Sequence, residues 1–503
     1  MPSKGRKGQK RMSELLRKGR LSHVRKDVAR FTSSAKDDER LVRHIVKINK
    51  AHVIMLAENG IIDTEDCKKI IEALNKIDGK LELSPEKEDA HMAVEEEVIK
   101  AAGSTVGGNL NLAKSRNDQV ATAIRMNLRE ELLKLVETIL ELQDALIQKS
   151  ERNLETVIPG YTHLQPAQPV TFAHYLVSQF DVLQRNIERF EENYRRVDLC
   201  PMGACALATT SFPIDRERVA ELLGFSGILE NSLDAVSTRD FLLETLANLA
   251  LLAVDVTRFV EDLIVWSTSE FGIAELPDEF AFTSSIMPQK KNPDVLEVIR
   301  ARMGILIGSF VSCATVLKGL PSAYNMDFQE VTPRLWEALQ TAQSCLSMLS
   351  KVTLSLEVKP NVLEKPSLTF LAATELANML VRNHKVPFRT AHKIVGALIK
   401  TLIDEHKSLN DVTPTLLAEI SDKFLETPLD VNVEEISISV DPYLVVKSHK
   451  TKGGPAEQET RRMINARKNV LTASEKWVWE KKDILEKTDR SLDAEADKIL
   501  GKG

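Results

Sequence analysis

The stretch from Ser284 to Asp294 holds the side chains of this sequence best suited to chemistry. It reads Ser-Ser-Ile-Met-Pro-Gln-Lys-Lys-Asn-Pro-Asp, and one acidic residue at its end accompanies hydroxyl, ammonium and amide groups. A Ser in such a loop could act as a base or a nucleophile, and the Lys side chains could bind a carboxylate. The stretch therefore predicts a loop that holds a negatively charged substrate while a proton moves. A solvated basic turn is the alternative interpretation.

A second candidate is His163, which lies between the hydrogen-bonding residues Thr162 and Gln165 in a Pro-rich turn. Imidazole titrates near neutrality, so His163 could act as a general acid. A histidine with a purely structural role remains the alternative.

Two further polar stretches are candidates for binding. Ser115–Gln119 ends a Gly-rich loop and opens a helix, where Arg116 and free backbone N–H groups could hold a carboxylate. The same residues could simply cap the helix, with Asn117 or Asp118 as the N-cap. Tyr324–Glu330 by itself is typical of an ordinary loop.

Long helices must position these loops. Apolar residues recur at steps of three and four from Asp118 to about Leu154, which predicts a helix roughly 55 Å long. Two more long helices are predicted over Phe172–Val197 and Thr238–Thr268, and the last is apolar on nearly all sides. Such lengths suit a helical bundle shared between subunits.

The segments between the helices carry helix-start and turn signals. We expect helices to begin after Asp63, Pro293 and Thr413. Polar connections marked by Gly or Pro are predicted over Gly103–Asn117, Pro159–Pro169 and Asp278–Asp294.

Composition sets the class of protein. The chain has 503 residues, of which 43% are apolar and 5% aromatic, with only 21 Gly and 19 Pro, so we expect a mostly α-helical protein of two to four domains. A net charge of −6 argues against a protein whose whole surface binds nucleic acid. Five scattered Cys residues without a CxxC pattern predict neither zinc nor a disulfide framework, and they fit a reduced, cytoplasmic protein.

Two segments bear on possible partners. Residues 1–30 carry eleven Lys and Arg against Glu14 and Asp27, and lack the apolar centre of a signal peptide. They predict a flexible basic arm, either a solubilising tail or a segment that binds nucleic acid or an acidic partner. The apolar segment Phe241–Trp266 is interrupted by charged residues, which favours a buried helix over a membrane span.

The order and spacing of these stretches resemble the fumarase/aspartase superfamily and, within it, the argininosuccinate lyase family. The resemblance covers nearly everything after residue 31. It is carried by Ser115–Gln119, Tyr161–Gln165, Ser211–Arg216, Asn231–Ala235, Met287–Asp294, Ala373–Ala377 and Val386–His392. The last two stretches separate it from the adenylosuccinate, fumarate and aspartate branches.

The resemblance implies an all-α, elongated, three-domain subunit whose central long helices form a 20-helix core in a homotetramer. The active sites would be shared by three subunits. The expected division is a basic N-terminal arm over 1–30, an N-terminal helical domain over 31–115, a central bundle over 116–365 and a C-terminal helical domain over 366–503.

The implied reaction is β-elimination of argininosuccinate to arginine and fumarate, the last step of arginine biosynthesis, without a metal or organic cofactor. The Cβ proton is a very weak acid, so the resulting carbanion must be stabilised as an aci-carboxylate by fixed cations and donors. Ser284 would be the base, Lys290 and Asn292 would stabilise the aci-carboxylate, and His163, oriented by Glu297, would protonate the departing nitrogen. Substrate would be held by Ser34, Arg116, Asn117, Thr162, Arg239, Tyr324 and Gln329.

Three departures from the family pattern concern substrate binding. Asn111–Lys114 replaces His-Thr-Gly/Ala-Arg, and Thr283 stands where a Gly usually precedes the catalytic Ser. Thr332 replaces a Lys expected to hold a carboxylate, and Arg334 is a candidate to compensate for it. The alternatives are therefore a related lyase that releases fumarate from another N-succinyl compound, or a non-catalytic structural protein like the delta-crystallins of the same family. Joint retention of the five catalytic candidates weighs against the latter.

Overall fold

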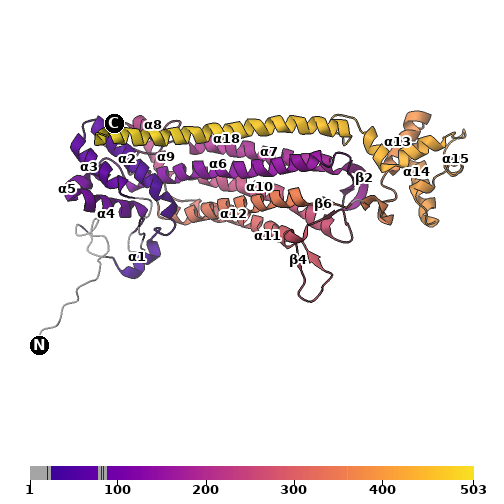
Figure 1. The fold of residues 1–503 in the computed structure, drawn as a ribbon, viewed down its shortest axis with the longest axis horizontal. Helices are drawn as coiled ribbons and strands as arrows, with labels where there is room; N and C mark the ends of the chain where they lie inside the picture. Colours follow the sequence, from indigo (N-terminus) through magenta and orange to yellow (C-terminus); the bar gives the residue numbers. More distant parts are fainter. Residues whose placement is uncertain are drawn as a thin grey trace.

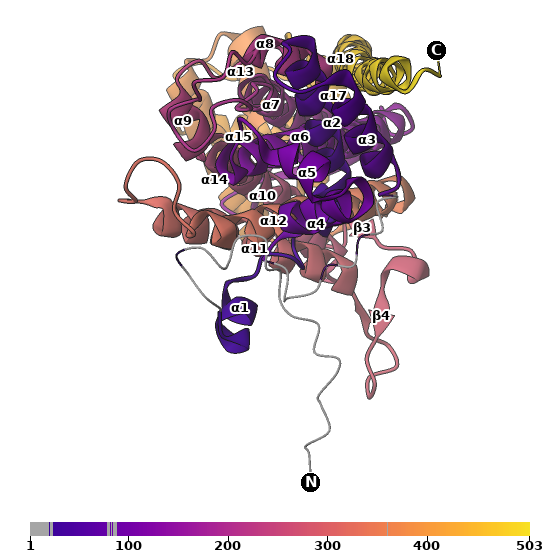
Figure 2. The ribbon, with the colours of Figure 1, turned by 90° about the vertical axis from the view of Figure 1, so that its left-hand side faces the viewer.

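The computed structural model describes residues 20, 24–77, 81, 83, 88–359 and 361–502. Figure 1 shows an elongated, mostly helical molecule, with α2 to α5 at one end and α13 to α15 at the other. Figure 2 looks along the body from the end that carries α2 to α5, and shows the long helices packed side by side behind it. The all-α prediction is confirmed.

Five long helices form the body. They are α6 (Arg116–Glu151), α7 (Phe172–Val197), α10 (Asp240–Ser267), α11 (Asp294–Leu317) and α12 (Phe328–Ser355). The three long helices predicted from periodicity are α6, α7 and α10, and the predicted start after Pro293 is confirmed by α11. Their apolar faces belong to one continuous hydrophobic core. Among the described residues, no helix is long and apolar enough to cross a membrane.

Short helices surround the start of α6. They are α1 (Lys26–Thr32), α2 (Val42–Glu58), α3 (Thr64–Asn75), α4 (Ala90–Ala102), α5 (Ser104–Gly107), α8 (Arg216–Leu222) and α9 (Ser232–Ser237). Helix α3 begins after Asp63, as predicted. Residues 1–19 and 21–23 of the predicted basic arm lie outside the described residues, and its last residues form the first turns of α1.

Three small antiparallel ribbons interrupt the helices among the described residues. They pair β1 (Val157–Thr162) with β2 (Gln165–Thr171), β3 (Ala274–Glu275) with β6 (Glu357–Val358), and β4 (Phe282–Thr283) with β5 (Lys291–Asn292). Two of these ribbons lie over predicted polar connections, at Pro159–Pro169 and Asp278–Asp294. Both stretches are hairpins, because the chain must reverse between antiparallel long helices and can pair its backbone as it does so.

The C-terminal part combines a compact cluster with one long helix. Helices α13 (Ala373–His384), α14 (Phe388–Asp404), α15 (Pro414–Ser421), α16 (Val433–Val440) and α17 (Pro442–Ser448) enclose a separate hydrophobic core. Thr413 caps α15, as its sequence signal predicted. Helix α18 (Glu457–Leu500) then runs back along the body to α2 and α3, as the yellow helix of Figure 1 shows. The predicted domain boundaries at residues 115 and 365 stay predictions.

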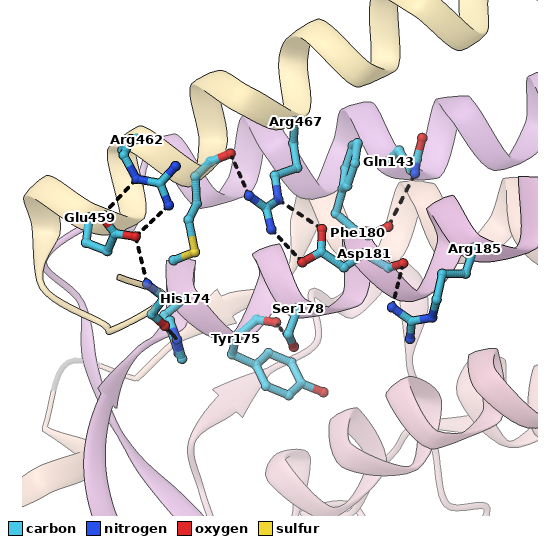
Figure 3. Close-up of polar contacts among 12 residues, drawn as sticks. Gln143, His174, Tyr175, Ser178, Phe180, Asp181, Arg185, Glu459, Arg462 and Arg467 are labelled. Atoms are coloured by element: carbon cyan, nitrogen blue, oxygen red, sulfur yellow. Dashed lines mark hydrogen bonds and ion pairs between the residues drawn. The ribbon is translucent and has the colours of Figure 1, made fainter. Parts of the chain in front are cut away.

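Polar contacts fasten the start of α18 to α7, as Figure 3 shows. Arg467 forms two parallel hydrogen bonds to Asp181, of 2.9 and 2.7 Å. His174 donates through Nε2 to the carbonyl oxygen of Gly453 at 3.0 Å, and the Gly453 N–H donates to Glu459 at 2.7 Å. Only nine of the 44 residues of α18 are buried, so the helix packs on the body through a narrow strip of side chains. The polar contacts add to that packing.

Replacing Arg467 by Met is expected to loosen the first half of α18 slightly. A half-exposed ion pair contributes about 0.2–1 kcal/mol, so local opening should become more frequent by at most about fivefold. Hydrogen exchange of the amides of residues 457–470 measures this opening. The control is Arg462→Met, because the Arg462 partner Glu459 lies on the same helix. Equal exchange in the two variants would show that the contact with Asp181 adds nothing.

Candidate active site

A cavity of about 430 Å³ lies at the α4 end of the body, lined by the segment before α2, by α4, by the start of α6, by Arg239 just before α10 and by the start of α12. Six of the seven residues predicted to hold substrate line it: Ser34, Arg116, Asn117, Arg239, Tyr324 and Gln329. These residues come from four separate stretches of sequence, so only the tertiary fold brings them together. The seventh, Thr162, lies elsewhere, in the β1–β2 hairpin.

Arg239 is the most deeply buried cation of this cavity. Its side chain is 3% exposed, and its guanidinium lies 4.4 Å above the ring of Phe328. Nη1 donates to the carbonyl oxygens of Val236 and Thr238, whereas Nε and Nη2 have no hydrogen-bond partner. Burial lowers the Arg239 pKa to about 10, which leaves the group charged at neutral pH. A buried guanidinium with two free donors is a ready partner for a carboxylate.

Acidic side chains also line the cavity. Ser34 donates to Asp38 at 2.7 Å, and burial raises the Asp38 pKa to about 6. Arg116 pairs with Asp89 at 2.9 Å, while Asp89 also caps α4 by accepting from the Met92 N–H. A cavity lined by both carboxylates and cations suits a substrate that carries both kinds of charge.

The start of α6 is held rigidly beneath the cavity. Ser115 is its N-cap and Asp118 completes a capping box, so neither Asn117 nor Asp118 is the cap residue. Asp118 is fully buried and also accepts from the N–H groups of Gly203 and Cys205. The side chain of Asn117 donates to the carbonyl oxygen of Ala206 at 3.0 Å. These contacts fix the direction in which Arg116 and Asn117 meet the cavity.

Sequence reasoning missed two histidines near this cavity and did not include Lys114 among the site residues. His91 lines the cavity, and its Nδ1 lies 3.0 Å from Gln119 Oε1, while Gln119 donates to Asn111. His52 donates through Nε2 to the carbonyl oxygen of Leu112 at 2.8 Å. Asp89 is a typical N-cap residue, and His91 follows it by two positions at the start of the helix. This signal could have pointed to His91.

The structure shows where the residues that depart from the family pattern lie. Thr283 lies in strand β4 opposite Lys291 and is not among the residues with a positive φ, so no glycine is needed there. Thr332 lines the cavity, and its hydroxyl donates to the carbonyl oxygen of Phe328. Arg334 does not line the cavity. Its side chain is exposed and pairs with Glu337 on the same helix. The expectation that Arg334 compensates for Thr332 is therefore wrong within one chain.

Ser284 lies at the base of the β4–β5 hairpin, which projects from the body (Figures 1 and 2). Its Oγ accepts from the backbone N–H groups of Ile286 and Met287, at 3.3 and 3.2 Å. Its own N–H donates to the carbonyl oxygen of Lys290 at 3.4 Å. Two N–H donors aimed at one hydroxyl oxygen favour its deprotonated form, which is what a serine base requires.

The two lysines of the hairpin differ in their surroundings. Lys291 is anchored by ion pairs to Asp278 at 2.8 Å and to Glu275 at 3.2 Å, and these hold the hairpin to the preceding segment. Lys290 is exposed and lines a second cavity of about 530 Å³ together with Asn292. Lys290 is therefore the lysine that remains available for a ligand.

His163 occupies the tip of the β1–β2 hairpin. It and Leu164 both have φ of +57°, between the paired residues Thr162 and Gln165, which is the geometry of a tight two-residue turn. His163 is exposed. A ring contact of 5.2 Å between Tyr161 and Phe271 fixes the hairpin to the segment after α10.

Within one chain the predicted site residues form three groups rather than one. The cavity lies at the start of α6, and the His163 turn follows its other end, about 54 Å away along a 36-residue helix. Neither the Ser284 hairpin nor the His163 turn contributes to the cavity. Glu297 is exposed in the first turn of α11.

Two family descriptions match the chain. The family described as Lyase matches residues 20–308, and the one described as Argininosuccinate lyase C-terminal matches residues 370–438. Among curated relatives, the argininosuccinate lyase of Methanocaldococcus jannaschii is 43% identical over 95% of this chain and 99% of its own length. That of Methanosarcina barkeri is 42% identical over 96% of this chain and 98% of its own length.

Solved structures share the fold. An EDDS lyase in complex with formate superposes with a TM-score of 0.84 at 30% identity, covering 92% of each chain. A class II fumarase from Schistosoma mansoni superposes with a TM-score of 0.67 at 16% identity, covering 80% of this chain and 90% of the fumarase, which is a likeness of fold alone.

Proposed function

Since the chain belongs to the argininosuccinate lyase family, we propose that it splits argininosuccinate into arginine and fumarate. The observation that carries this proposal is the cavity in which six predicted substrate-binding residues meet, among them Arg239, whose buried guanidinium has no hydrogen-bond partner at Nε and Nη2. Argininosuccinate has carboxylates for Arg239 and cationic groups for the acidic side chains that line the cavity.

In the proposed reaction, Ser284 Oγ removes a proton from the carbon next to a carboxylate. The electron pair is delocalised into that carboxylate, which then carries two negative charges. The ammonium group of Lys290 and the amide of Asn292 stabilise this charge. The C–N bond breaks, its electrons leave with the guanidinium nitrogen, and His163 supplies the proton that this nitrogen takes up. The N–H groups of Ile286 and Met287 support the role of Ser284, because they stabilise its alkoxide.

A complete site requires several subunits in this proposal, and we infer a homotetramer in which three chains contribute to each site. The hairpin that carries Ser284 exposes large apolar side chains: Ile286 is 83% exposed and Phe282 is 62% exposed. Helices α10 and α11 also expose apolar side chains along the body, namely Leu251, Val254, Val298, Ile305, Ile307 and Val311. Such surfaces support burial against other copies of the chain.

An antiparallel neighbour is the simplest way to complete the site. It would bring the His163 end of one subunit beside the cavity end of another, since the two lie at opposite ends of α6. We further propose a cytoplasmic location, from the five buried free Cys residues and the biosynthetic reaction.

The first test is fumarate release followed by ultraviolet absorbance. Purified protein is expected to release fumarate from argininosuccinate and not from adenylosuccinate or aspartate. No release from any of the three would instead support a non-catalytic protein, and would contradict the proposed function.

A second candidate function is elimination from a different N-succinyl compound. It is favoured by the 30% identity to EDDS lyase and by Thr332, which brings no charge to the cavity. Release of fumarate from such a compound, but not from argininosuccinate, would decide for this candidate.

A further inference from the structure

Lys114 is a cavity cation without a carboxylate bound to it. Three cationic side chains line the cavity: Lys114, Arg116 and Arg239. Arg116 is paired with Asp89, and Arg239 offers its free donors from the α10 side. Within the described part of the chain, Lys114 Nζ reaches one acceptor, Oδ1 of Asn49. An ammonium group has three N–H donors, so two remain for a ligand.

Asn49 holds Lys114 in place from helix α2. Its Nδ2 donates to the carbonyl oxygen of Ile45 at 2.7 Å, and this leaves Oδ1 to accept from Lys114. Asn49 is 2% exposed, so its amide has little freedom to turn away. The ammonium group is thus fixed at the cavity wall rather than swinging in solvent.

The α12 wall of the cavity supplies no competing cation. Its polar contributors are Gln329 and Thr332, with Tyr324 just before the helix. The Thr332 hydroxyl donates to the Phe328 carbonyl oxygen, and the Gln329 amide donates to the Tyr324 hydroxyl at 3.4 Å. A second substrate carboxylate, beyond the one that Arg239 can hold, must find its cation elsewhere.

We propose that the ammonium group of Lys114, oriented by Asn49, binds a carboxylate of the substrate inside this cavity. The proposal rests on the proposed function for the identity of the substrate, and adds a substrate-binding residue to it. It also makes substrate binding sensitive to pH, because a lysine at this place can lose its charge.

The surroundings of Lys114 explain that sensitivity. Burial lowers the Lys114 pKa to about 7, whereas the negative charges of Asp118 on α6 and Glu95 on α4 act to raise it. His91 and His52 also lie close enough to Lys114 to feel its charge. Burial lowers the pKa of His91 to about 4 and of His52 to about 3, so both are neutral at pH 7.

The direction of the pH effect on substrate binding follows from these charges. Lys114 in the free enzyme is charged below pH 7 and increasingly neutral above it, and a bound carboxylate favours the charged form. Substrate must therefore bind together with a proton at alkaline pH. The KM is expected to rise as pH increases above 7, while kcat changes less, because the bound substrate keeps Lys114 charged.

Two substitutions of Lys114 distinguish the effect of its charge from the effect of losing that charge as pH rises. Lys114→Met removes the contact and should raise KM about 10- to 100-fold at pH 6, with thermal stability near that of the wild type. Lys114→Arg keeps a charge that does not titrate in this range, so its KM should stay nearly constant from pH 6 to pH 9. An unchanged KM in Lys114→Met at pH 6 would overturn the proposal, as would an alkaline rise in Lys114→Arg equal to that of the wild type.

A binding measurement tests the same contact without turnover. Calorimetric titration with fumarate at pH 8, in two buffers of different ionisation enthalpy, gives the number of protons taken up on binding. The wild type is expected to take up close to one proton, and Lys114→Arg close to none. Equal uptake in the two proteins, or none in the wild type, would contradict the role of Lys114. Failure to cleave argininosuccinate with normal proton uptake would count against the proposed function alone.

Discussion

Replacing Ser284 by Ala is expected to lower turnover of argininosuccinate by about 10³-fold or more, because loss of a general base costs roughly 10²- to 10⁴-fold. The hydroxyl oxygen receives two backbone N–H groups, and a methyl group cannot use them. Steady-state kinetics of fumarate release, with arginine inhibition as a measure of binding, gives the size of the effect. Arginine inhibition should change less than about twofold, since the proposed role of Ser284 is to take a proton from the succinyl part of the substrate, which arginine lacks.

Ser285→Ala is the matched control. Ser285 is the adjacent hydroxyl of the same hairpin, it is exposed, and the hydrogen bonds to the Ile286 and Met287 N–H groups belong to Ser284. Its turnover should stay within about threefold of the wild type. If Ser284→Ala retained a tenth or more of wild-type turnover, another group would have to be the base.

The second large effect is recovery of activity in mixed oligomers. Arg239→Met and Ser284→Ala are each expected to be nearly inactive, since one removes the buried guanidinium and the other the base. If the cavity and the hairpin of one site come from different chains, random assembly of the two variants leaves about a quarter of the sites intact. Co-expression with two affinity tags, followed by sequential purification and assay, measures that recovery.

The control pair combines Ser284→Ala with Lys290→Met. Both changes lie on the same hairpin, so every site in the mixed oligomer lacks one of the two groups. No recovery is expected. Recovery in neither pair would show that one chain supplies both the cavity and the hairpin, and the shared site would then have to be abandoned.

The long helices were predictable because their apolar period is unbroken. The predicted second helix has the bounds of α7, and the first differs from α6 by a few residues at each end. Helix α18 was not predicted, although it is the longest helix among the described residues. Only nine of its 44 residues are buried, so its apolar seam is too narrow to stand out from the charged residues around it.

The hairpins were missed for a different reason. Proline at positions 159, 166 and 169 argues locally against a strand, yet Pro159 and Pro169 face one another across the β1–β2 ribbon. His163 and Leu164 both have a positive φ, which neither residue type favours by itself. The rest of the hairpin imposes this conformation, so the residue types alone do not predict it. Tertiary pairing outweighed local preference.

The cavity was predictable residue by residue but not as a whole. The resemblance to a known family supplied six of its residues, whereas Asp38, His91 and Lys114 were not among the predicted site residues. Asp38 lies before α2, His91 in α4 and Lys114 just before α6, so the fold brings residues 23 to 76 positions apart to one cavity. Pairwise spacing along the chain carries little information about such encounters.

Helix α18 returns to the α2 end of the molecule, where its last turns contact the helix that carries Asn49. Lys47 pairs with Asp489 at 2.7 Å and Lys50 with Asp493 at 3.0 Å, so α18 braces the helix that carries Asn49. Asn49 in turn aims the Lys114 ammonium group. If Lys114 binds a carboxylate as proposed, breaking these two ion pairs would weaken that binding, at a site to which α18 itself contributes no side chain.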